Sequence, residues 1–190
     1  MSLFDLTGHV AIITGGNGGI GLGMALGLAK AGASLAIVGR NSDKNKIAIE
    51  KLQGMGATAI AIEKDITEEL AGTDVVTKVE DRFGRIDILI NNAGSNIRKR
   101  PEELSLNDFR WVQDTNLTSA FVFSQAVYPK FKTIGKGKII NIGSMYSIFG
   151  GAVATAYSVS KGGLIQMTKS MAAAWAADKI QVNAVLPGWI

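Results

Sequence analysis

Short apolar runs alternate along the chain with longer segments in which apolar residues recur at helical spacing. The short runs are typical of buried strands, and the longer segments are typical of helices packed on one side. The pattern predicts strands at Val10–Thr14, Ser34–Gly39, Thr58–Glu63, Ile86–Asn91, Lys138–Ile142 and Gln181–Leu186. It predicts helices near residues 19–31, 42–54, 67–83, 106–132 and 157–177.

Strands this apolar are typically covered on both faces, as in a parallel sheet flanked by helices. Regular alternation of strands and helices indicates successive βαβ units. No repeat, low-complexity tract or linker divides the sequence. We therefore expect one α/β domain over residues 1–190, built as a Rossmann-type doubly wound parallel sheet with helices on both faces.

Composition excludes several kinds of chemistry. The chain has 190 residues, of which 47% are hydrophobic and 19% charged, as in an ordinary globular protein. It has no cysteine, which excludes disulfides, thiolate metal sites and cysteine nucleophiles. His9 is the single histidine, and one histidine cannot build a zinc site. We expect no metal site.

The net charge of +4 raises the question of a nucleic-acid partner. The longest basic cluster, Arg98-Lys99-Arg100, is short and has no interleaved aromatic residues, which favours a solvated or substrate-facing cluster over a phosphodiester track. The first residues do not resemble a secretory signal, and no apolar run approaches membrane-spanning length. We expect a cytoplasmic protein that binds neither nucleic acid nor membrane.

A glycine-rich string, Thr14-Gly15-Gly16-Asn17-Gly18-Gly19-Ile20-Gly21, follows the first predicted strand. It fits both GxGxxG and GxxxGxG. Glycines let a pyrophosphate approach the backbone, and the helix that follows offers unpaired N–H groups to the phosphates. Because the string lies between the first strand and a helix, it favours nucleotide binding over a purely structural turn.

The end of the second strand reads Val38-Gly39-Arg40-Asn41. An acid at this place holds the ribose 2′-hydroxyl of NAD, and none is present. Arg40 can instead make a bidentate contact with a 2′-phosphate. We expect NADP(H) to be favoured over NAD(H); the alternative is a solvent-exposed loop arginine.

Tyr157 and Lys161 lie four residues apart and therefore share one helix face. A free phenol is a poor base at neutral pH, but an ammonium about 4 Å away, at an effective dielectric of about 20, favours a phenolate by up to about 4 kcal/mol. Ser144 follows the strand at Lys138–Ile142, at the carboxyl edge where open α/β sheets bind ligands. Its hydroxyl can hydrogen-bond a substrate oxygen.

Taken in order, these motifs resemble the short-chain dehydrogenase/reductase family over essentially the whole chain. The matching segments are Thr14–Gly21, Asn91-Asn92-Ala93-Gly94, Asn116, Ser144, Tyr157 with Lys161, and Pro187-Gly188. The resemblance implies an NAD(P)-dependent oxidoreductase that interconverts a secondary alcohol and a ketone. It also implies a homo-oligomer, a tetramer or a dimer.

The resemblance implies a role for each matching residue. Tyr157 is the general acid/base, with Lys161 favouring its ionised form and binding the nicotinamide ribose. Ser144 orients the substrate oxygen, and Asn116 holds a water in a proton relay. The implied cofactor-binding residues are Gly15, Asn17, Gly19, Ile20, Gly21, Arg40, Asp65, Ile66, Asn92, Ala93, Gly94, Tyr157, Lys161, Pro187 and Gly188.

Three of these residues also have simpler interpretations. Asp65 matches the family's adenine-binding position; the alternative is an ordinary cap for the helix that follows. Ser144 is a candidate turn cap, and Asn116 a candidate partner for backbone groups.

Two segments, Leu3–Gly8 and Asn92–Pro101, resemble sugar-acid dehydrogenases of the gluconate 5-dehydrogenase and 2-dehydro-3-deoxygluconate 5-dehydrogenase type. Arg98 or Arg100 is placed to reach a substrate carboxylate; the alternative is that both face solvent or another subunit. Two other functions stay open: a 3-oxoacyl thioester reductase, and a catalytically inactive nucleotide-binding regulatory protein.

The sequence stops at Trp189-Ile190, directly after Pro187-Gly188. The family normally continues with a substrate-covering loop, further helices and a seventh strand. We expect these elements to be absent from this chain.

Overall fold

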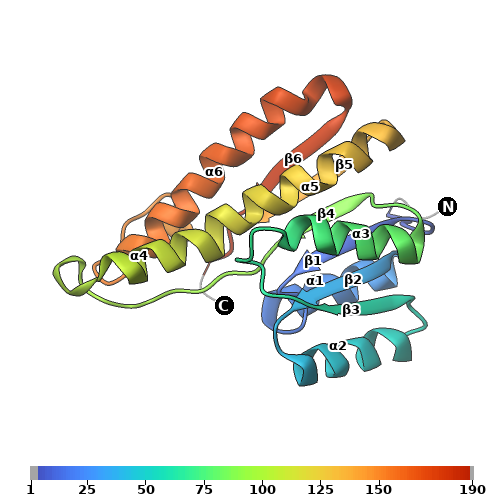
Figure 1. Cartoon of the computed structure of the whole chain (residues 1–190), viewed down its shortest axis with the longest axis horizontal. Helices are drawn as coiled ribbons and strands as arrows, with labels where there is room; N and C mark the ends of the chain where they lie inside the picture. Colours follow the sequence, from blue (N-terminus) through green and yellow to red (C-terminus); the bar gives the residue numbers. More distant parts are fainter. Residues whose placement is uncertain (1–3, 189–190) are drawn as a thin grey trace.

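The computed structural model describes residues 4–188 (Figure 1). Its strands are β1 (Val10–Thr14), β2 (Ser34–Gly39), β3 (Ala59–Glu63), β4 (Ile88–Asn91), β5 (Gly137–Ile142) and β6 (Ile180–Val185). Its α-helices are α1 (Gly19–Lys30), α2 (Ser42–Gly54), α3 (Ala71–Phe83), α4 (Leu106–Gln113), α5 (Ser119–Ile134) and α6 (Thr155–Trp175). Short 3₁₀ turns lie at Pro101–Glu103, Met145–Ser147 and Ala176–Asp178.

The six strands form one parallel sheet in the order β3-β2-β1-β4-β5-β6. The chain runs outward from β1 to β3, returns to place β4 beside β1, and then runs outward again to β6. This reversal is the mark of a doubly wound sheet, so the predicted fold class is confirmed.

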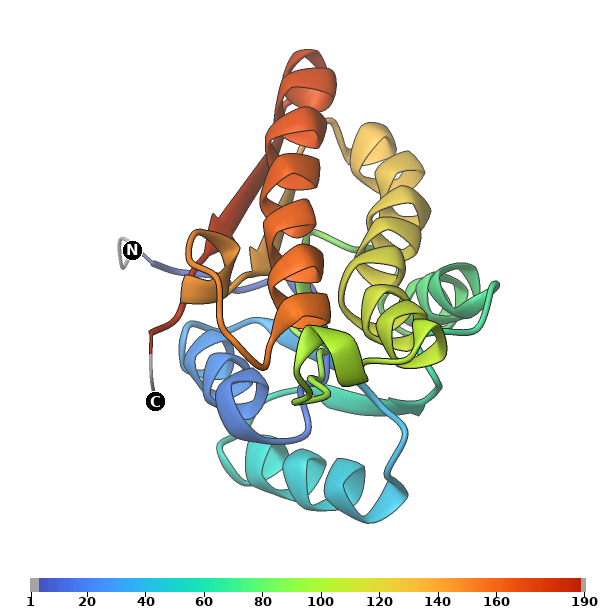
Figure 2. The ribbon, with the colours of Figure 1, turned by 90° about the vertical axis from the view of Figure 1, so that its left-hand side faces the viewer.

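Helices cover both faces of the sheet (Figures 1 and 2). On one face, α3, α5 and α6 pack on strand residues such as Ile12 and Leu89. On the opposite face, α1 and α2 pack on residues such as Ile13 and Leu35. Because side chains alternate along a strand, neighbouring apolar residues such as Ile12 and Ile13 enter different cores. This arrangement explains the continuous apolar runs.

The edge strand β6 differs from the central strands. Ile180 and Val182 are buried, whereas Gln181 and Asn183 are exposed. A period of two indicates a strand with one covered face. The expectation that every strand is covered on both sides is therefore wrong for β6.

Several predicted boundaries also shift. The helix predicted at 106–132 is two helices, α4 and α5, separated by a wider π-helical turn at Asp114–Thr118. The helix predicted from residue 67 begins at Ala71, because the Asp65 carboxylate accepts hydrogen bonds from Thr67 and holds a turn there. Strand β4 begins at Ile88 rather than at residue 86.

Candidate active site

The carboxyl ends of β1 and β4 mark the point where the strand order reverses. Thr14 at the end of β1 lies in register with Asn91 at the end of β4. The connections leave these two strands toward opposite faces of the sheet, which opens a crevice between them. The glycine-rich loop begins on one side of this crevice, and Asn92-Ala93-Gly94 begins on the other.

The two loops are tied to each other. The Asn92 side chain donates hydrogen bonds to the carbonyls of Thr14 and Gly15, both at 3.1 Å, and Thr14 Oγ1 accepts from the backbone N–H groups of Asn92 and Ala93. A Cβ on Gly21 would lie 2.3 Å from the Gly15 carbonyl oxygen, so this turn requires glycine. The loop thus leaves its backbone open to a ligand.

Two cavities meet at the crevice. The first has a volume of about 680 Å³ and the second about 260 Å³, and both are bordered by Gly94 and Ser95. Among the predicted site residues, the first is lined by Ile20, Asn92, Gly94, Ser144, Tyr157, Lys161, Pro187 and Gly188. The second is lined by Gly15, Asn17, Arg40, Asp65, Ile66, Ala93 and Gly94. Two adjoining compartments beside a glycine loop fit the two halves of a dinucleotide.

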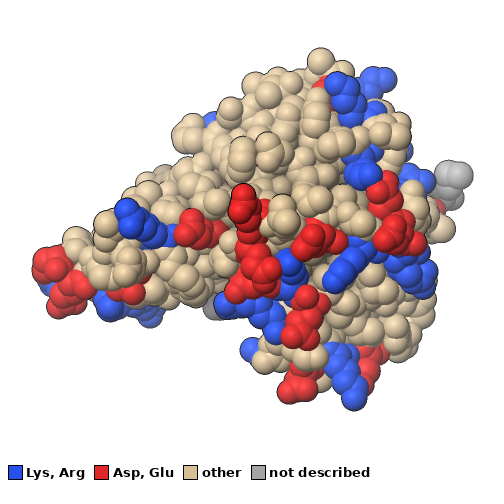
Figure 3. All heavy atoms as spheres, in the orientation of Figure 1, with Lys and Arg blue, Asp and Glu red and all other residues tan. Residues whose placement is uncertain are grey.

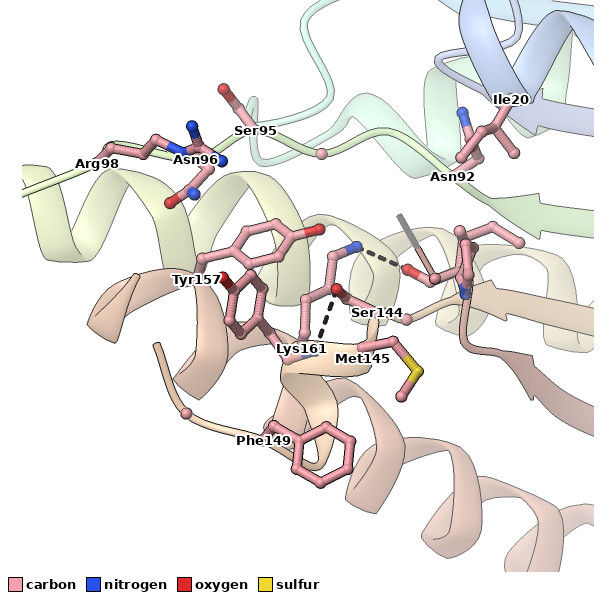
Figure 4. A pocket seen from close by; sticks show the side chains of 17 residues that line it. Ile20, Asn92, Ser95, Asn96, Arg98, Ser144, Met145, Phe149, Tyr157 and Lys161 are labelled. Atoms are coloured by element: carbon pink, nitrogen blue, oxygen red, sulfur yellow. Dashed lines mark hydrogen bonds between the residues drawn. The ribbon is translucent and has the colours of Figure 1, made fainter. Parts of the chain in front are cut away.

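Three functional side chains converge in the first cavity. Helix α6 begins at Thr155, so Tyr157 and Lys161 lie on successive turns of its first part. Ser144 comes from the end of β5. Figure 4 shows the Tyr157 hydroxyl, the Lys161 ammonium and the Ser144 hydroxyl turned toward one space. A proton donor, a cation and a second hydroxyl therefore face the same ligand volume.

Lys161 is a buried cation, with 3% of the residue exposed. Its Nζ donates a 2.6 Å hydrogen bond to the Ile142 carbonyl and lies 5.8 Å from the centre of the Tyr157 ring. Burial lowers the pKa of Lys161 to about 8, because the charged form is desolvated. The side chain therefore keeps most of its charge at neutral pH.

The Ser144 hydroxyl caps the 3₁₀ turn that follows it. Its oxygen accepts a 3.2 Å hydrogen bond from the Tyr146 backbone N–H, while Ser147 Oγ accepts from the Ser144 backbone. A hydroxyl that accepts in this way still has its own hydrogen to donate. The capping role and a role toward substrate are thus compatible.

Asn116 lies in the π-helical turn and borders neither cavity. Its Oδ1 accepts from the Ser95 backbone N–H at 2.8 Å, and its Nδ2 donates to the Ser95 carbonyl and to Ser160 Oγ, both at 2.9 Å. These contacts join the loop after β4 to helix α6. The proton-relay role stays a prediction. Gly19 and Gly21 also border neither cavity.

Basic side chains gather at the second cavity. Arg40, Lys44 and Lys64 border it, together with the single acid Asp65. Lys64 pairs with Glu68 at 2.6 Å and with Asp74 at 2.8 Å, and Arg40 pairs with Asp65 at 3.3 Å. Lys44 is the one of these three cations that forms no ion pair within residues 4–188, so an anionic group in this compartment would share or displace the acids that pair with Arg40 and Lys64.

Sequence reasoning missed several cavity residues. Asn96 borders the first cavity and Thr115 the second. Asn96 Oδ1 and Thr115 Oγ1 are buried and have no hydrogen-bond partner in the described part of the chain. Buried polar atoms are normally paired, so both fit a site completed by a ligand. The available signal was adjacency, because Thr115 precedes Asn116 and Asn96 follows the Asn92-Ala93-Gly94 turn.

Other kinds of site receive no support within residues 4–188. In this range no three His, Cys, Asp or Glu side chains are grouped to hold a metal ion. No helix there combines the length and apolarity needed to cross a membrane. On the face drawn in Figure 3, acidic and basic side chains are interleaved rather than gathered into one basic surface.

Comparison with known proteins places the chain among enzymes of one family. A family model described as short chain dehydrogenase matches residues 9–190. The chain is 40% identical over its full length to a 2-dehydro-3-deoxy-D-gluconate 5-dehydrogenase from Formosa agariphila, of which it covers 72%. It is 37% identical over 98% of its length to a gluconate 5-dehydrogenase from Gluconobacter oxydans, of which it covers 73%. It is 36% identical over 97% of its length to a 3-oxoacyl-(acyl-carrier-protein) reductase from Chlamydia pneumoniae, of which it covers 75%.

Solved structures agree with this placement. A protein from Agrobacterium tumefaciens named a gluconate dehydrogenase superposes with a TM-score of 0.96 at 39% identity, over 100% of this chain and 75% of that one. A protein from Beutenbergia cavernae named an NAD(P)-dependent gluconate 5-dehydrogenase, with NADP bound at low occupancy, superposes with a TM-score of 0.93 at 34% identity, over 99% of this chain and 75% of that one. The chain belongs to the short-chain dehydrogenase family.

Proposed function

We propose that the protein is an NAD(P)-dependent oxidoreductase that interconverts a secondary alcohol and a ketone on a gluconate-type sugar acid. The observation that carries this proposal is the convergence of Tyr157, Ser144 and Lys161 in one cavity beside the glycine loop. A nicotinamide dinucleotide, when bound, supplies the hydride donor or acceptor.

The residues of this chain handle the proton and the substrate oxygen. Tyr157 gives a proton to the ketone oxygen during reduction and takes it from the alcohol during oxidation. Ser144 donates its free hydrogen to the same oxygen and orients it. Lys161 places its ammonium 5.8 Å from the centre of the Tyr157 ring, in the same cavity, where it can bind the nicotinamide ribose.

We propose that NADP(H) is the favoured cofactor and NAD(H) the weaker one. Arg40 borders the second cavity with Lys44 and Lys64, and no acid stands at 38–41 to hold a ribose 2′-hydroxyl. The bound NADP in the Beutenbergia cavernae protein supports this preference. The glycine loop, Asn92 and Thr115 are suited to hold the rest of the dinucleotide.

The proposed substrate class rests on Arg98. Of the two arginines considered from sequence, Arg98 borders the first cavity, and no ion pair to it is formed within residues 4–188. Arg100 borders neither cavity and pairs with Glu102 at 2.7 Å. An arginine facing a cavity that holds a carbonyl-reducing centre suits an anionic substrate. The names of the sugar-acid relatives support the same class.

An absorbance assay of NADPH with a panel of matched compounds tests this proposal. We expect gluconate-type acids to be turned over in preference to neutral polyols of equal chain length and to a 3-oxoacyl thioester. Arg98→Ala should lower kcat/KM for the acids by about 10- to 100-fold, the range of a charged hydrogen bond, and leave neutral polyols unaffected. Arg100→Ala is the matched control and should change neither. Preference for the thioester or for neutral polyols would contradict the proposed substrate.

Two broader expectations stay predictions: a cytoplasmic location, and assembly as a tetramer or dimer. The exposed alanines near the end of α6, Ala173 and Ala174, support close packing against a second copy. Light scattering measures the assembly directly.

A further inference from the structure

The second cavity contains an ion pair that the chemistry proposed above does not use. Arg40 lies just after β2 and Asp65 just after β3, on neighbouring strands of the sheet. Arg40 Nη1 donates to Asp65 Oδ2 at 3.3 Å, and both residues border the cavity. The arginine proposed to bind a 2′-phosphate is thus already paired with a carboxylate.

Asp65 is held in place from its other side. Its Oδ1 accepts from the backbone N–H of Thr67 at 2.9 Å and from Thr67 Oγ1 at 2.8 Å. Partial burial alone would raise the pKa of Asp65, but the hydrogen bonds from Thr67 and Arg40 outweigh this and keep the pKa below its ordinary value. The group is therefore an ionised, fixed acceptor at neutral pH.

Arg40 is the more exposed member of the pair. Its side chain is 62% exposed, against 32% for Asp65, and a single 3.3 Å hydrogen bond leaves most of its N–H donors open. An exposed pair of this kind is weak, so a dianionic 2′-phosphate can take the guanidinium away from Asp65. This displacement costs free energy, because the Arg40–Asp65 ion pair must be broken and the Asp65 carboxylate then stays beside the phosphate.

We propose that Asp65 is a selectivity residue that acts through Arg40: it competes with the 2′-phosphate for the guanidinium and thereby moderates the preference for NADP(H) over NAD(H). This inference rests on the NADP(H) preference proposed above. This role does not exclude the adenine contact that the family resemblance implies for Asp65, because a carboxylate has about four acceptor sites and three are used within this chain. Adenine is the same in the two cofactors, so an adenine contact does not by itself discriminate between them.

Asp65→Asn separates the two roles. The amide oxygen can still accept from Thr67, so the turn is preserved, while the charge that holds Arg40 is removed. We expect the ratio of the NADH to the NADPH dissociation constant to rise about three- to fivefold, the range of one exposed ion pair. Dissociation constants measured by nicotinamide fluorescence give the readout without turnover. Glu69→Gln is the matched control, because it removes a nearby charge that forms no ion pair with Arg40; we expect it to change neither constant.

The same titrations in an Arg40→Ala background test whether Asp65 acts through Arg40. There the gain from Asp65→Asn should fall to less than half. A full gain in that background would mean direct repulsion and would overturn the inference. So would an equal loss of NADPH and NADH binding in Asp65→Asn, which is the signature of an adenine contact, or no change in either. If Arg40→Ala by itself leaves the dissociation constants of both cofactors unchanged, the proposed NADP(H) preference is also wrong. The Arg40→Ala measurement therefore distinguishes failure of that preference from failure of the role proposed for Asp65.

Discussion

The parallel strands start at one side of the sheet, here called the amino edge, and end at the other, the carboxyl edge. The two differ in how a buried charge is paired. At the amino edge, Asp87 precedes β4 and is 4% exposed. Its carboxylate accepts from Arg85 Nε at 2.9 Å, from Arg85 Nη2 at 2.6 Å and from the Val10 backbone N–H at 2.9 Å. Burial alone would raise the pKa of Asp87, but these hydrogen bonds outweigh it and lower the pKa. The charge is buried and fully partnered.

At the carboxyl edge, Lys161 is buried to a similar degree, but its described partner is the Ile142 carbonyl rather than a carboxylate. Asn96 and Thr115 also keep a buried polar atom without a partner among the described residues. The amino edge also has a buried polar atom, His9 Nδ1, without a hydrogen-bond partner among the described residues. The contrast therefore lies in charge: one edge neutralises its buried ion for stability, and the other leaves an ion facing a ligand cavity.

The largest expected effect comes from removing the Tyr157 hydroxyl. Tyr157→Phe keeps the ring packed against Tyr146 but deletes the proposed proton donor. We expect kcat/KM to fall by about 10³- to 10⁴-fold, the upper range for general acid–base catalysis. The dissociation constant of the cofactor and the free energy of unfolding should barely change. Activity assays, fluorescence titration and urea denaturation measure these three quantities. Residual activity near that of the wild type would remove Tyr157 from the mechanism.

The amino edge should respond in the reverse manner. Asp87→Ala removes the hydrogen bonds to Arg85 and leaves the buried Val10 N–H without an acceptor. We expect the free energy of unfolding to fall by about 3 kcal/mol. Losing one member of a buried pair is costly, and the partial exposure of Arg85 puts the effect at the lower end of that range. Cofactor affinity at the far edge should be unchanged.

Glu102→Ala is the matched control for Asp87→Ala. Glu102 also pairs with an arginine, Arg100, but 63% of its side chain is exposed. Exposed pairs contribute little, so the free energy of unfolding should barely change in a urea titration. Equal effects of the two substitutions would mean that burial of Asp87 does not matter.

Local chemistry made much of the carboxyl edge predictable. The glycine string after β1, Arg40 after β2 and the spacing of Tyr157 and Lys161 are all short-range patterns, and the predicted strands and sheet class are confirmed. A parallel sheet gathers the ends of its strands at one edge, so residues that follow different strands meet there.

The parts that were not predicted depend on contacts between distant segments. The Arg40–Asp65 pair joins residues that follow two neighbouring strands, and the Asp87 carboxylate accepts from Val10 at the start of the neighbouring strand β1. The π-helical turn around Asn116 has no local sequence signal, because its residues read as a continuous helix. Hydrophobic periodicity fixes which face of a segment is buried, but it does not specify which polar groups are brought together.

A smaller effect should appear in the pH dependence of stability, and it tests the buried charge directly. The pKa of Lys161 is about 8 in the folded chain, against an ordinary value of 10.5. Between these values the unfolded chain binds more protons than the folded chain, so the free energy of unfolding rises with pH. From about pH 8 to about pH 9.5, below most of the tyrosine titration, wild type should gain about 1 to 2 kcal/mol relative to Lys161→Met.

Urea titrations at both pH values measure this difference, and Lys138→Met is the matched control. Lys138 lies exposed on β5, so its removal should leave the pH dependence parallel to that of wild type. If Lys161→Met also runs parallel to wild type, the ammonium is solvated in the folded chain and the two edges do not differ in how they bury charge. If wild type and Lys138→Met gain stability and Lys161→Met does not, the protein carries a buried cation that destabilises its fold at neutral pH, and that cation lines the cavity that Tyr157 also lines.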